Sequence, residues 1–239
     1  MSSVFNVENR RALVVGGSGA LGHTIAAQLE DAGAKVVTAD LAGSGAQLDI
    51  DVSNTESVQA AVVGARQQLG GSVEILVNAA GVQGRQSEIT EMDDADWVRV
   101  IDINLTGVMR VSRAVAAEMK QQRWGRIIHV ASQLGIKGAG ELAHYTAAKG
   151  GVITFTKSLA IELAPHNVLV NSVAPGPFET PMLASLSDEW RAKKLGELPL
   201  GRFGLPEEVA PTVLLLAGEP SGNIFVGQTL GPNSGDVMP

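Results

Sequence analysis

A single unit recurs along this sequence: a short apolar run, a turn of small and polar residues, and then a helical pattern. The runs are not interrupted by alternating polar residues. Strands buried on both faces read in this way, because helices cover both sides of a parallel sheet. The runs therefore predict the strands of one sheet, at residues 12–15, 35–39, 73–77, 126–130 and 168–173, with weaker runs at 46–52 and 224–230.

Apolar residues recur three and four positions apart between these runs, which is typical of helices with one buried face. The spacing is clearest at Leu21, Ile25 and Leu29, at Val111, Val115 and Met119, and at Val152, Phe155, Leu159 and Leu163. Strands that alternate with helices form βαβ units. The sequence therefore predicts an α/β Rossmann fold: a doubly wound parallel sheet of about seven strands with helices on both faces, in one domain over residues 1–239.

The composition argues against several classes of protein. A net charge of −7 disfavours nucleic acid and anionic membranes as main partners. The absence of cysteine excludes disulfide frameworks and thiol nucleophiles, and the four histidines lack metalloprotease spacing, so we expect no metal site. No apolar stretch approaches ~18 residues, so we expect no membrane span, and a cytoplasmic location fits.

The turn after the first run is rich in glycine and stands between a predicted strand and a predicted helix. Its spacing Gly17-x-Gly19-x-x-Gly22 matches a dinucleotide-binding turn, in which the backbone approaches a pyrophosphate at a helix N-terminus. In a chain with 28 glycines this spacing needs a second signal. An NTPase phosphate loop is disfavoured, since His23 stands where that loop needs lysine. The residues expected to contact the cofactor here are Gly16, Gly17, Ser18, Gly19, Ala20, Leu21 and Gly22.

A carboxylate at the end of the second apolar run supports the interpretation of the glycine turn as a dinucleotide-binding turn. Asp40 lies 18 residues after Gly22, where a carboxylate can bind both hydroxyls of the adenosine ribose. It repels the 2′-phosphate of NADP: at ~4 Å and an effective dielectric constant of ~20, each charge pair costs ~4 kcal/mol, or about three decades of affinity. Neither the glycine turn nor residues 41–43 supply lysine or arginine. The sequence favours NAD (NADH) over NADP, unless Asp40 merely ends a strand.

The pair Tyr145 and Lys149 is the sharpest candidate for chemistry. Residues four apart share a helix face, and an ammonium beside a phenol favours the phenolate. Close attraction is worth up to ~3 pKa units, which would bring the phenol from ~10 towards neutrality, where it exchanges a proton with an alcohol or ketone oxygen. The same spacing also suits an amphipathic surface pair, but Tyr145 is the chain's only tyrosine.

Two further polar residues stand at informative places. Ser132 follows the run 126–130, where its hydroxyl can hold a substrate oxygen or simply cap the strand end. No G-x-S-x-G motif surrounds it, so a hydrolase is not indicated. Asn104 lies inside a helical pattern, where asparagine competes for backbone hydrogen bonds, and it indicates a kink or a polar role.

In this order, the motifs resemble the short-chain dehydrogenase/reductase family, in its single-domain branch and over essentially the whole chain. The likeness extends to residues 171–176 and to 201–210, which read GRFGLPEEVA. Within the family it is similar to 3-oxoacyl reductase-like, hydroxyacyl and cyclic-alcohol dehydrogenases. The resemblance implies an NAD(H)-dependent oxidoreductase that interconverts a secondary alcohol and a ketone, assembled as a homotetramer. The departures from the family pattern are Val15, Ala20, Ala79 and residues 232–235, away from the proton-transfer residues.

The resemblance also implies a role for each site residue. Tyr145 would be the general acid/base, and Ser132 would orient the substrate oxygen. Lys149 would bind the nicotinamide ribose and lower the pKa of Tyr145, and Asn104 would hold a water in a proton relay. The other implied cofactor contacts are Asp51 and Val52 at the adenine, Asn78, Ala79, Ala80 and Gly81 beside the adenosine ribose, and Pro175, Gly176, Phe178 and Thr180 at the nicotinamide carboxamide.

Substrate choice is expected to fall to the loops around this set, above all to a substrate loop at about 178–200. Lys137 and Arg85 would suit an anionic tail, or equally be solvated loop charges. The alternative class is a non-catalytic NAD-binding sensor or interaction protein, against which the four-residue catalytic set argues. The polar candidates for substrate contact are Gln83, Arg85, Gln133, Lys137, Glu141 and His144, and the apolar candidates are Phe178, Met182, Leu183, Leu186 and Trp190.

Overall fold

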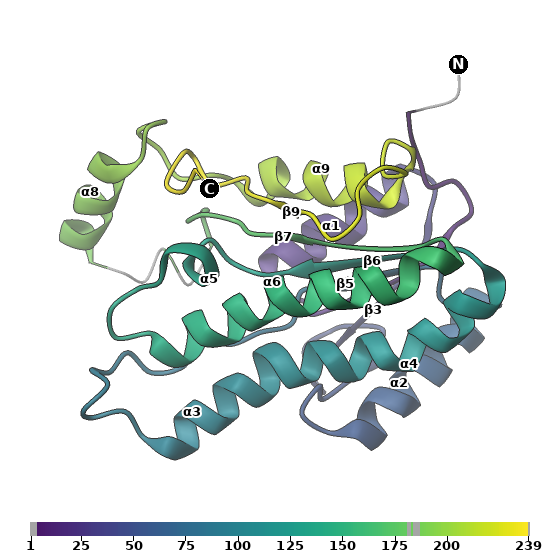
Figure 1. The fold of residues 1–239 in the computed structure, drawn as a ribbon, viewed down its shortest axis with the longest axis horizontal. Helices are drawn as coiled ribbons and strands as arrows, with labels where there is room; N and C mark the ends of the chain where they lie inside the picture. Colours follow the sequence, from purple (N-terminus) through teal and green to yellow (C-terminus); the bar gives the residue numbers. More distant parts are fainter. Residues whose placement is uncertain (1–3, 181–182, 184–186, 239) are drawn as a thin grey trace.

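A computed structural model describes residues 4–180, 183 and 187–238 of the chain. Within this part, seven parallel strands form one sheet in the order β4-β3-β2-β5-β6-β7-β9. Helices cover both faces of the sheet (Figure 1), so the predicted Rossmann architecture is confirmed. The strands are β2 (Arg11–Val15), β3 (Lys35–Asp40), β4 (Leu48–Asp49), β5 (Ile75–Asn78), β6 (Gly125–Val130), β7 (Val168–Val173) and β9 (Thr229–Leu230).

The central strands are buried on both faces, as their unbroken apolar runs predict. Every residue of β5, β6 and β7 is buried. The five clear runs match strands to within two residues at either end, whereas the two weaker runs shrink to the two-residue edge strands β4 and β9. Strands buried on both faces are therefore easy to recognise as long apolar runs in the sequence, whereas the short edge strands have no such clear run.

Two sets of helices cover the two faces. On one face lie α1 (Ala20–Asp31) and α9 (Pro206–Ala217), whose apolar residues pack in one core cluster with β2 and β5. On the other face lie α2 (Thr55–Leu69), α4 (Gly107–Gln122) and α6 (Ala143–Leu163), around a second cluster. Figure 1 shows α1 and α9 above the sheet and the other set below it.

One long helical segment contains an irregular turn. The helix α3 (Asp94–Ile101) runs into a π-helical turn, η1 (Asp102–Thr106), and then into α4. The N–H of Gly107 donates to the carbonyl oxygen of Asp102, five residues back. This turn contains Asn104, so the irregularity that asparagine indicated is present.

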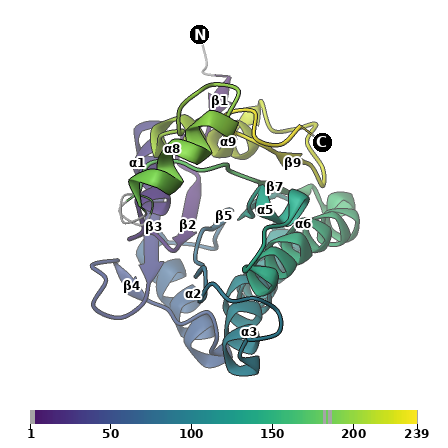
Figure 2. The ribbon, with the colours of Figure 1, turned by 90° about the vertical axis from the view of Figure 1, so that its left-hand side faces the viewer.

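Shorter elements lie at the two ends of the sheet. Beyond the carboxyl ends of the strands lie α5 (Leu134–Lys137) and α8 (Asp188–Glu197); in Figure 2, α8 is at the upper left and α5 is just right of the middle. A two-residue pairing of β1 (Phe5–Asn6) with β8 (Glu219–Pro220) was not predicted, because two residues carry no periodicity. A 3-10 turn, η2 (Ala164–His166), follows α6. No helix of the described residues has the length and hydropathy to cross a membrane.

The order of the strands shows where a ligand should bind. The chain passes from β2 outward to β3 and β4, and then returns to the other side of β2 with β5. In open α/β sheets the crevice at such a reversal, beyond the carboxyl ends of the strands, is the usual ligand site. Val15 and Asn78 face one another at these two strand ends.

Candidate active site

One cleft, with a volume of about 990 Å³, lies at this edge of the sheet. It gathers residues from segments far apart in the sequence: the glycine turn, the ends of β5, β6 and β7, and α5, α6 and α8. The sequence-predicted residues that line it are Gly16, Gly19, Ala20, Leu21, Gly22, Ala79, Gly81, Asn104, Ser132, Tyr145, Lys149, Pro175, Gly176, Phe178 and Thr180.

The glycine turn is packed so closely that side chains would not fit. Gly16 has a φ of +83°, and a Cβ there would lie 2.4 Å from the backbone nitrogen of Ala80. A Cβ at Gly22 would lie 2.0 Å from the carbonyl oxygen of Gly16. The turn leads into α1, whose N-cap Gly19 provides no side-chain cap. The first N–H groups of α1 are therefore free to bind an anion such as a pyrophosphate.

Asp40 lies against this turn. Its Oδ2 accepts from the backbone nitrogen of Ser18 at 3.0 Å, and its Oδ1 accepts from that of Leu41 at 2.8 Å. The carboxylate at the end of β3 is thereby held beside the glycine turn. This donor set of glycine backbone, helix N-terminus and carboxylate fits the diphosphate and adenosine ribose of a dinucleotide.

Ser132, Tyr145 and Lys149 meet on the other side of the cleft. Ser132 comes two residues after the end of β6, and a hydrogen bond joins its side chain to the Tyr145 phenol. Lys149, one turn along α6, donates from Nζ to the carbonyl oxygen of Val130 at 2.8 Å. Its Nζ lies 5.8 Å from the centre of the Tyr145 ring. Tyr145 and Lys149 therefore lie on one face of α6, and this face meets Ser132 after the end of β6.

The electrostatics of this set differ from the sequence-based expectation. Burial raises the pKa of the Tyr145 phenol, and the hydrogen bond with Ser132 offsets this only in part. Burial also lowers the pKa of Lys149 to about 8. The expected lowering of the Tyr145 pKa by Lys149 is therefore wrong for this structure, because desolvation disfavours the phenolate and weakens the ammonium that was to stabilise it.

Asn104 joins the π-helical turn to the loop after β5. It is fully buried, and its Nδ2 donates to the carbonyl oxygens of Val82 at 2.8 Å and Val100 at 3.0 Å. A Cβ placed on Gly81 would stand 2.5 Å from Asn104 Oδ1 and 3.5 Å from Lys149 Nζ. Asn104 and Lys149 thus reach the same small space beside Gly81.

Several predicted contacts lie away from the cleft wall. Asn78 is buried, and its Nδ2 donates to Ser112 Oγ at 3.2 Å inside the protein. The Asp51 carboxylate accepts from Ser53 Oγ at 2.6 Å, and Val52 packs in a core cluster. The predicted residues that do not line the cleft are Gly17, Ser18, Asp40, Asp51, Val52, Asn78 and Ala80. The cofactor contacts predicted for these residues would lie outside this cleft.

His144 and Arg85 are not placed to touch a substrate in the cleft, and neither lines it. His144 is fully buried; its Nδ1 accepts from the backbone nitrogen of Tyr145 at 2.7 Å, and its Nε2 lies 3.1 Å from the carbonyl oxygen of Arg85. His144 therefore satisfies an otherwise free N–H in the first turn of α6. The other polar candidates, Gln83, Gln133, Lys137 and Glu141, line the cleft.

The wall of the cleft that α8 forms contains residues that sequence reasoning missed. Lys194 and Glu197 line it from α8, and Asp236 binds Lys137 and Lys194 from the C-terminal segment. Asp236 is 99 positions from Lys137 in sequence, and no local pattern links them. Phe178, Leu183 and Trp190 line the cleft as expected, whereas Met182 and Leu186 lie outside the described residues.

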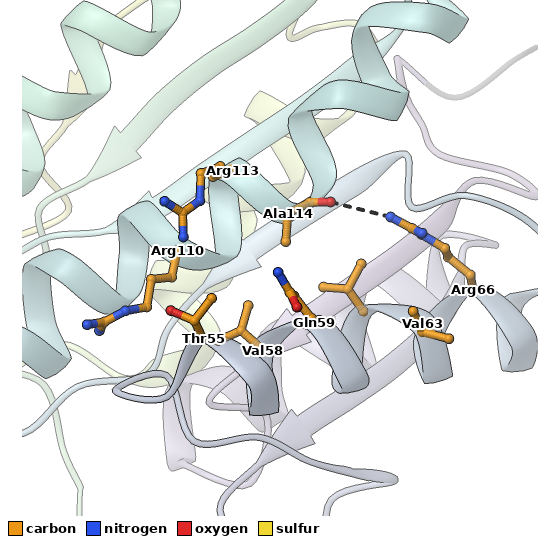
Figure 3. A pocket seen from close by; sticks show the side chains of 9 residues that line it. Thr55, Val58, Gln59, Val63, Arg66, Arg110, Arg113 and Ala114 are labelled. Atoms are coloured by element: carbon orange, nitrogen blue, oxygen red, sulfur yellow. Dashed lines mark hydrogen bonds between the residues drawn. The ribbon is translucent and has the colours of Figure 1, made fainter.

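A second pocket, of about 390 Å³, lies between α2 and α4 and holds none of the predicted site residues. Figure 3 shows Arg66 reaching across it to the carbonyl oxygen of Ala114, at 3.4 Å. Two of its arginines are paired with carboxylates: Arg66 with Glu118, and Arg110 with Asp102. The predicted catalytic residues Asn104, Ser132, Tyr145 and Lys149 therefore line the larger cleft and not this pocket.

Comparison with known proteins gives consistent findings. A family profile described as "Enoyl-(Acyl carrier protein) reductase" matches residues 17–235. The chain is 41% identical over 245 residues to the 3-oxoacyl-[acyl-carrier-protein] reductase FabG of Vibrio cholerae, covering 98% of this chain and 99% of that protein. It is 40% identical over 245 residues to FabG of Escherichia coli K12, with the same coverage. A putative gluconate dehydrogenase from Agrobacterium tumefaciens superposes with a TM-score of 0.91 at 30% identity, covering 98% of this chain and 99% of that one.

Proposed function

The chain belongs to the short-chain dehydrogenase/reductase family of oxidoreductases, and on that premise we propose that it interconverts a secondary alcohol and a ketone with NAD(H) as the hydride carrier. One observation carries the proposal: Ser132, Tyr145 and Lys149 converge in the cleft that the glycine turn borders on its other side. We treat residues 1–239 as one NAD-binding domain with a substrate segment at about 178–200.

The bound cofactor would lie between these two sides. The glycine turn and the start of α1 would hold the diphosphate, and Asp40 the adenosine ribose. Lys149 would reach the nicotinamide ribose, and the backbone from Pro175 to Thr180 the carboxamide. When bound, the nicotinamide ring takes up or supplies the hydride.

The chain's own residues move and hold the proton. In the reduction direction, Tyr145 donates its phenolic proton to the carbonyl oxygen, which Ser132 holds by its hydroxyl. The raised pKa of Tyr145 suits this direction, because the phenol keeps its proton at neutral pH. In the oxidation direction the phenolate accepts the alcohol proton. Asn104 would help to return a proton from solvent through a water beside Lys149.

NAD rather than NADP is proposed from Asp40. The 2′-phosphate of NADP would meet this carboxylate where it binds Ser18 on the glycine turn. Residues 16–22 and 41–46 contain no lysine or arginine that would balance the second negative charge. At ~4 Å and an effective dielectric constant of ~20, the repulsion is ~4 kcal/mol per charge pair.

The relatives' names offer a specific substrate as a second candidate. Two FabG proteins are named as reductases of 3-oxoacyl groups on a carrier protein. At about 40% identity over the whole chain, this makes a 3-oxoacyl thioester a candidate for the ketone. The matching 3-hydroxyacyl thioester would be the substrate in the oxidation direction, and a cyclic alcohol is a separate candidate. No feature of the cleft favours a non-catalytic sensor.

A homotetramer and a cytoplasmic location remain predictions. The apolar Ile161 on α6 is 77% exposed, as a helix face would be if it packed against another copy of the chain. Native mass spectrometry would test this, with Ile161→Glu expected to shift the assembly towards smaller species.

The experiment that tests the proposal is a nicotinamide absorbance assay with NAD⁺ and a panel of secondary alcohols, including hydroxyacyl thioesters, cyclic alcohols and sugar alcohols. We expect turnover with at least one alcohol and its loss in Tyr145→Phe. Tight NADH binding without turnover of any alcohol or ketone would contradict the catalytic proposal and favour the sensor.

A further inference from the structure

The helix that carries Tyr145 starts after a residue that cannot cap it. The N-cap of α6 is Leu142, which makes no side-chain hydrogen bond. In most helices a polar N-cap side chain accepts from the N–H two or three positions further on. Tyr145 lies three positions after Leu142, and its N–H is among those that find no partner within the helix. The backbone of Tyr145 therefore needs an acceptor other than the N-cap.

His144 supplies this acceptor with one ring nitrogen and reaches a loop with the other. The backbone nitrogen of Tyr145 donates to His144 Nδ1 at 2.7 Å, and His144 is fully buried. Because Nδ1 accepts, the proton of the neutral ring is on Nε2, which then donates. Nε2 lies 3.1 Å from the carbonyl oxygen of Arg85 and 3.3 Å from Asp96 Oδ2. The imidazole thus bridges the start of α6 and the loop after β5.

Asp96, on α3, binds the same residue of that loop. Its Oδ2 accepts from the backbone nitrogen of Arg85 at 2.8 Å. Its Oδ1 accepts from the guanidinium of Arg99 at 2.6 Å, which holds the carboxylate in place. The backbone N–H of Arg85 is therefore bound by Asp96, and its carbonyl oxygen by His144.

The loop also packs closely against the imidazole. Gly84 has a φ of +78°, and a Cβ there would lie 2.6 Å from His144 Nε2 and 2.6 Å from Val100 Cγ2. Gln83 and Gln86, on either side of this stretch, line the cleft. Gln83 is one of the residues expected to contact the substrate. The imidazole therefore cannot shift without moving either α6 or a part of the cleft wall.

Building on the proposed function, we propose that His144 is a positioning residue that places Tyr145 relative to the loop at 82–86, with a separate task for each ring nitrogen. Nδ1 fixes the backbone of Tyr145, and with it the position of the phenol at the reacting oxygen. Nε2 fixes the loop, and with it the binding of the alcohol or ketone. The first task should be measured in kcat and the second in the KM for the alcohol.

Two amide variants separate the tasks, because each replaces only one ring nitrogen. His144→Asn puts its amide oxygen near the place of Nδ1 and has no donor for Arg85, whereas His144→Gln puts its amide N–H near the place of Nε2 and leaves the Tyr145 N–H without an acceptor. With NAD⁺ and the preferred alcohol, His144→Gln should lower kcat by about 10-fold to 100-fold at a nearly unchanged KM, since a misplaced reacting group is costly. His144→Asn should keep kcat within about twofold and raise the KM by about fivefold or more, because the loop must be ordered on binding.

Two further variants complete the comparison. Asp96→Ala removes the other anchor of the Arg85 backbone and leaves the imidazole in place, so it should raise the KM without lowering kcat. His166→Gln changes a histidine of η2, beyond the far end of α6, and should change neither constant. Thermal unfolding and NADH binding would show that each variant is folded. If the His144 variants do not fold, an unchanged KM in Asp96→Ala would still overturn the inference.

A merely structural histidine would not divide the two constants. An equal loss of kcat in His144→Asn and His144→Gln would overturn the inference, and so would two folded variants with the constants of the unaltered protein. A loss of kcat in His144→Gln alone, with a raised KM in His144→Asn alone, would support it.

Tyr145 also gives a readout that needs no turnover, because it is the chain's only tyrosine. Isotope-labelled tyrosine gives a single amide signal in a proton–nitrogen NMR spectrum, from the N–H that His144 binds. The amide proton should move upfield and exchange faster with deuterium in His144→Gln, and stay close to its place in His144→Asn. If no alcohol is turned over, the proposed function fails while this comparison still decides: a Tyr145 signal that is unchanged in His144→Gln, or equally changed in both variants, overturns the inference.

Discussion

Asn104 and Val82 exchange two hydrogen bonds: Asn104 Nδ2 donates to the carbonyl oxygen of Val82 at 2.8 Å, and Asn104 Oδ1 accepts from its backbone nitrogen at 3.2 Å. A single buried side chain thus completes the backbone bonding of the loop after β5. It joins that loop, which contributes Gly81 and Val82 to the cleft wall, to the π-helical turn.

This pair makes Asn104→Asp a severe change. A carboxylate would place an oxygen against the carbonyl oxygens of Val82 and Val100, in a site without solvent exposure. We expect the free energy of unfolding to fall by about 3 kcal/mol or more, as when a buried charge is left unpaired. Urea unfolding would measure it. Asn54→Asp is the control: Asn54 caps α2 with its Oδ1, which an aspartate replaces, so stability should stay within about 0.5 kcal/mol. A small effect at Asn104 would show that the two hydrogen bonds donated by its Nδ2 contribute little.

The pKa of Tyr145 predicts different pH profiles for the two directions of the reaction. Burial raises this pKa above 10.0, so at neutral pH the phenol is protonated. Alcohol oxidation needs the phenolate, and its rate should rise with pH by up to about tenfold per unit from about pH 6 to about pH 8. Ketone reduction needs the neutral phenol, and should vary little over that range. Steady-state rates in both directions would check this, and an oxidation rate independent of pH would contradict it.

The titration of Lys149 should affect the pH dependence of the KM for NAD⁺. Its pKa of about 8 means that its positive charge is lost as the pH rises through that value. The KM for NAD⁺ should therefore increase above about pH 8 if the ammonium binds the nicotinamide ribose. Lys149→Met should show a high KM at all pH values, without this inflection. If the KM for NAD⁺ of Lys149→Met still changes near pH 8, a group other than Lys149 causes that change.

Asp40 sets the expected cofactor preference. The unaltered protein should favour NAD⁺ over NADP⁺ in kcat/KM by about 100-fold or more. Asp40→Ser removes the negative charge, and should reduce the ratio to about tenfold or less, mainly by improving NADP⁺. Asp49→Ser, at the end of the adjacent strand β4, should leave the ratio unchanged. A preference for NADP⁺ in the unaltered protein would contradict the role given to Asp40.

Protein stability should fall in acid because of His129. Burial lowers the pKa of His129 from 6.5 to about 3, so between these values the unfolded chain binds a proton that the folded one does not. The stability contributed by neutral His129 is present above pH 6.5 and is lost as the pH falls below it. At about pH 4.5 the loss should be about 2–3 kcal/mol. His129→Gln should flatten this dependence, whereas His23→Gln, at an exposed position, should not. If the stability of His129→Gln falls as steeply with decreasing pH, a group other than His129 causes the loss.

The sequence predicted the sheet well because its signal is local. A strand such as β6, buried along all six residues, shows itself by its own composition, and Gly17, Gly19 and Gly22 mark the turn that follows β2. The pair Tyr145 and Lys149 was predictable for the same reason, since both lie on one turn of one helix.

Features that depend on distant contacts were not predictable. Asp236 meets Gln133, Lys137 and Lys194 only because the fold brings together residues that are far apart in the sequence. The raised pKa of Tyr145 comes from burial, and a spacing of four residues says nothing about the depth of a site. His144 illustrates the same limit: its position next to Tyr145 suggested a substrate contact, but its side chain turns inward to the backbone.

The central claim is that Tyr145 transfers the proton in an NAD(H)-dependent reaction, and the most direct measurement is the rate of NAD⁺ reduction by the preferred alcohol in the unaltered protein and in Tyr145→Phe. The phenyl ring keeps the shape of the site but has no proton to exchange. The account predicts a fall in kcat of about 100-fold to 10,000-fold with NADH binding unchanged. A Tyr145→Phe variant that oxidises the alcohol at the unaltered rate would contradict it.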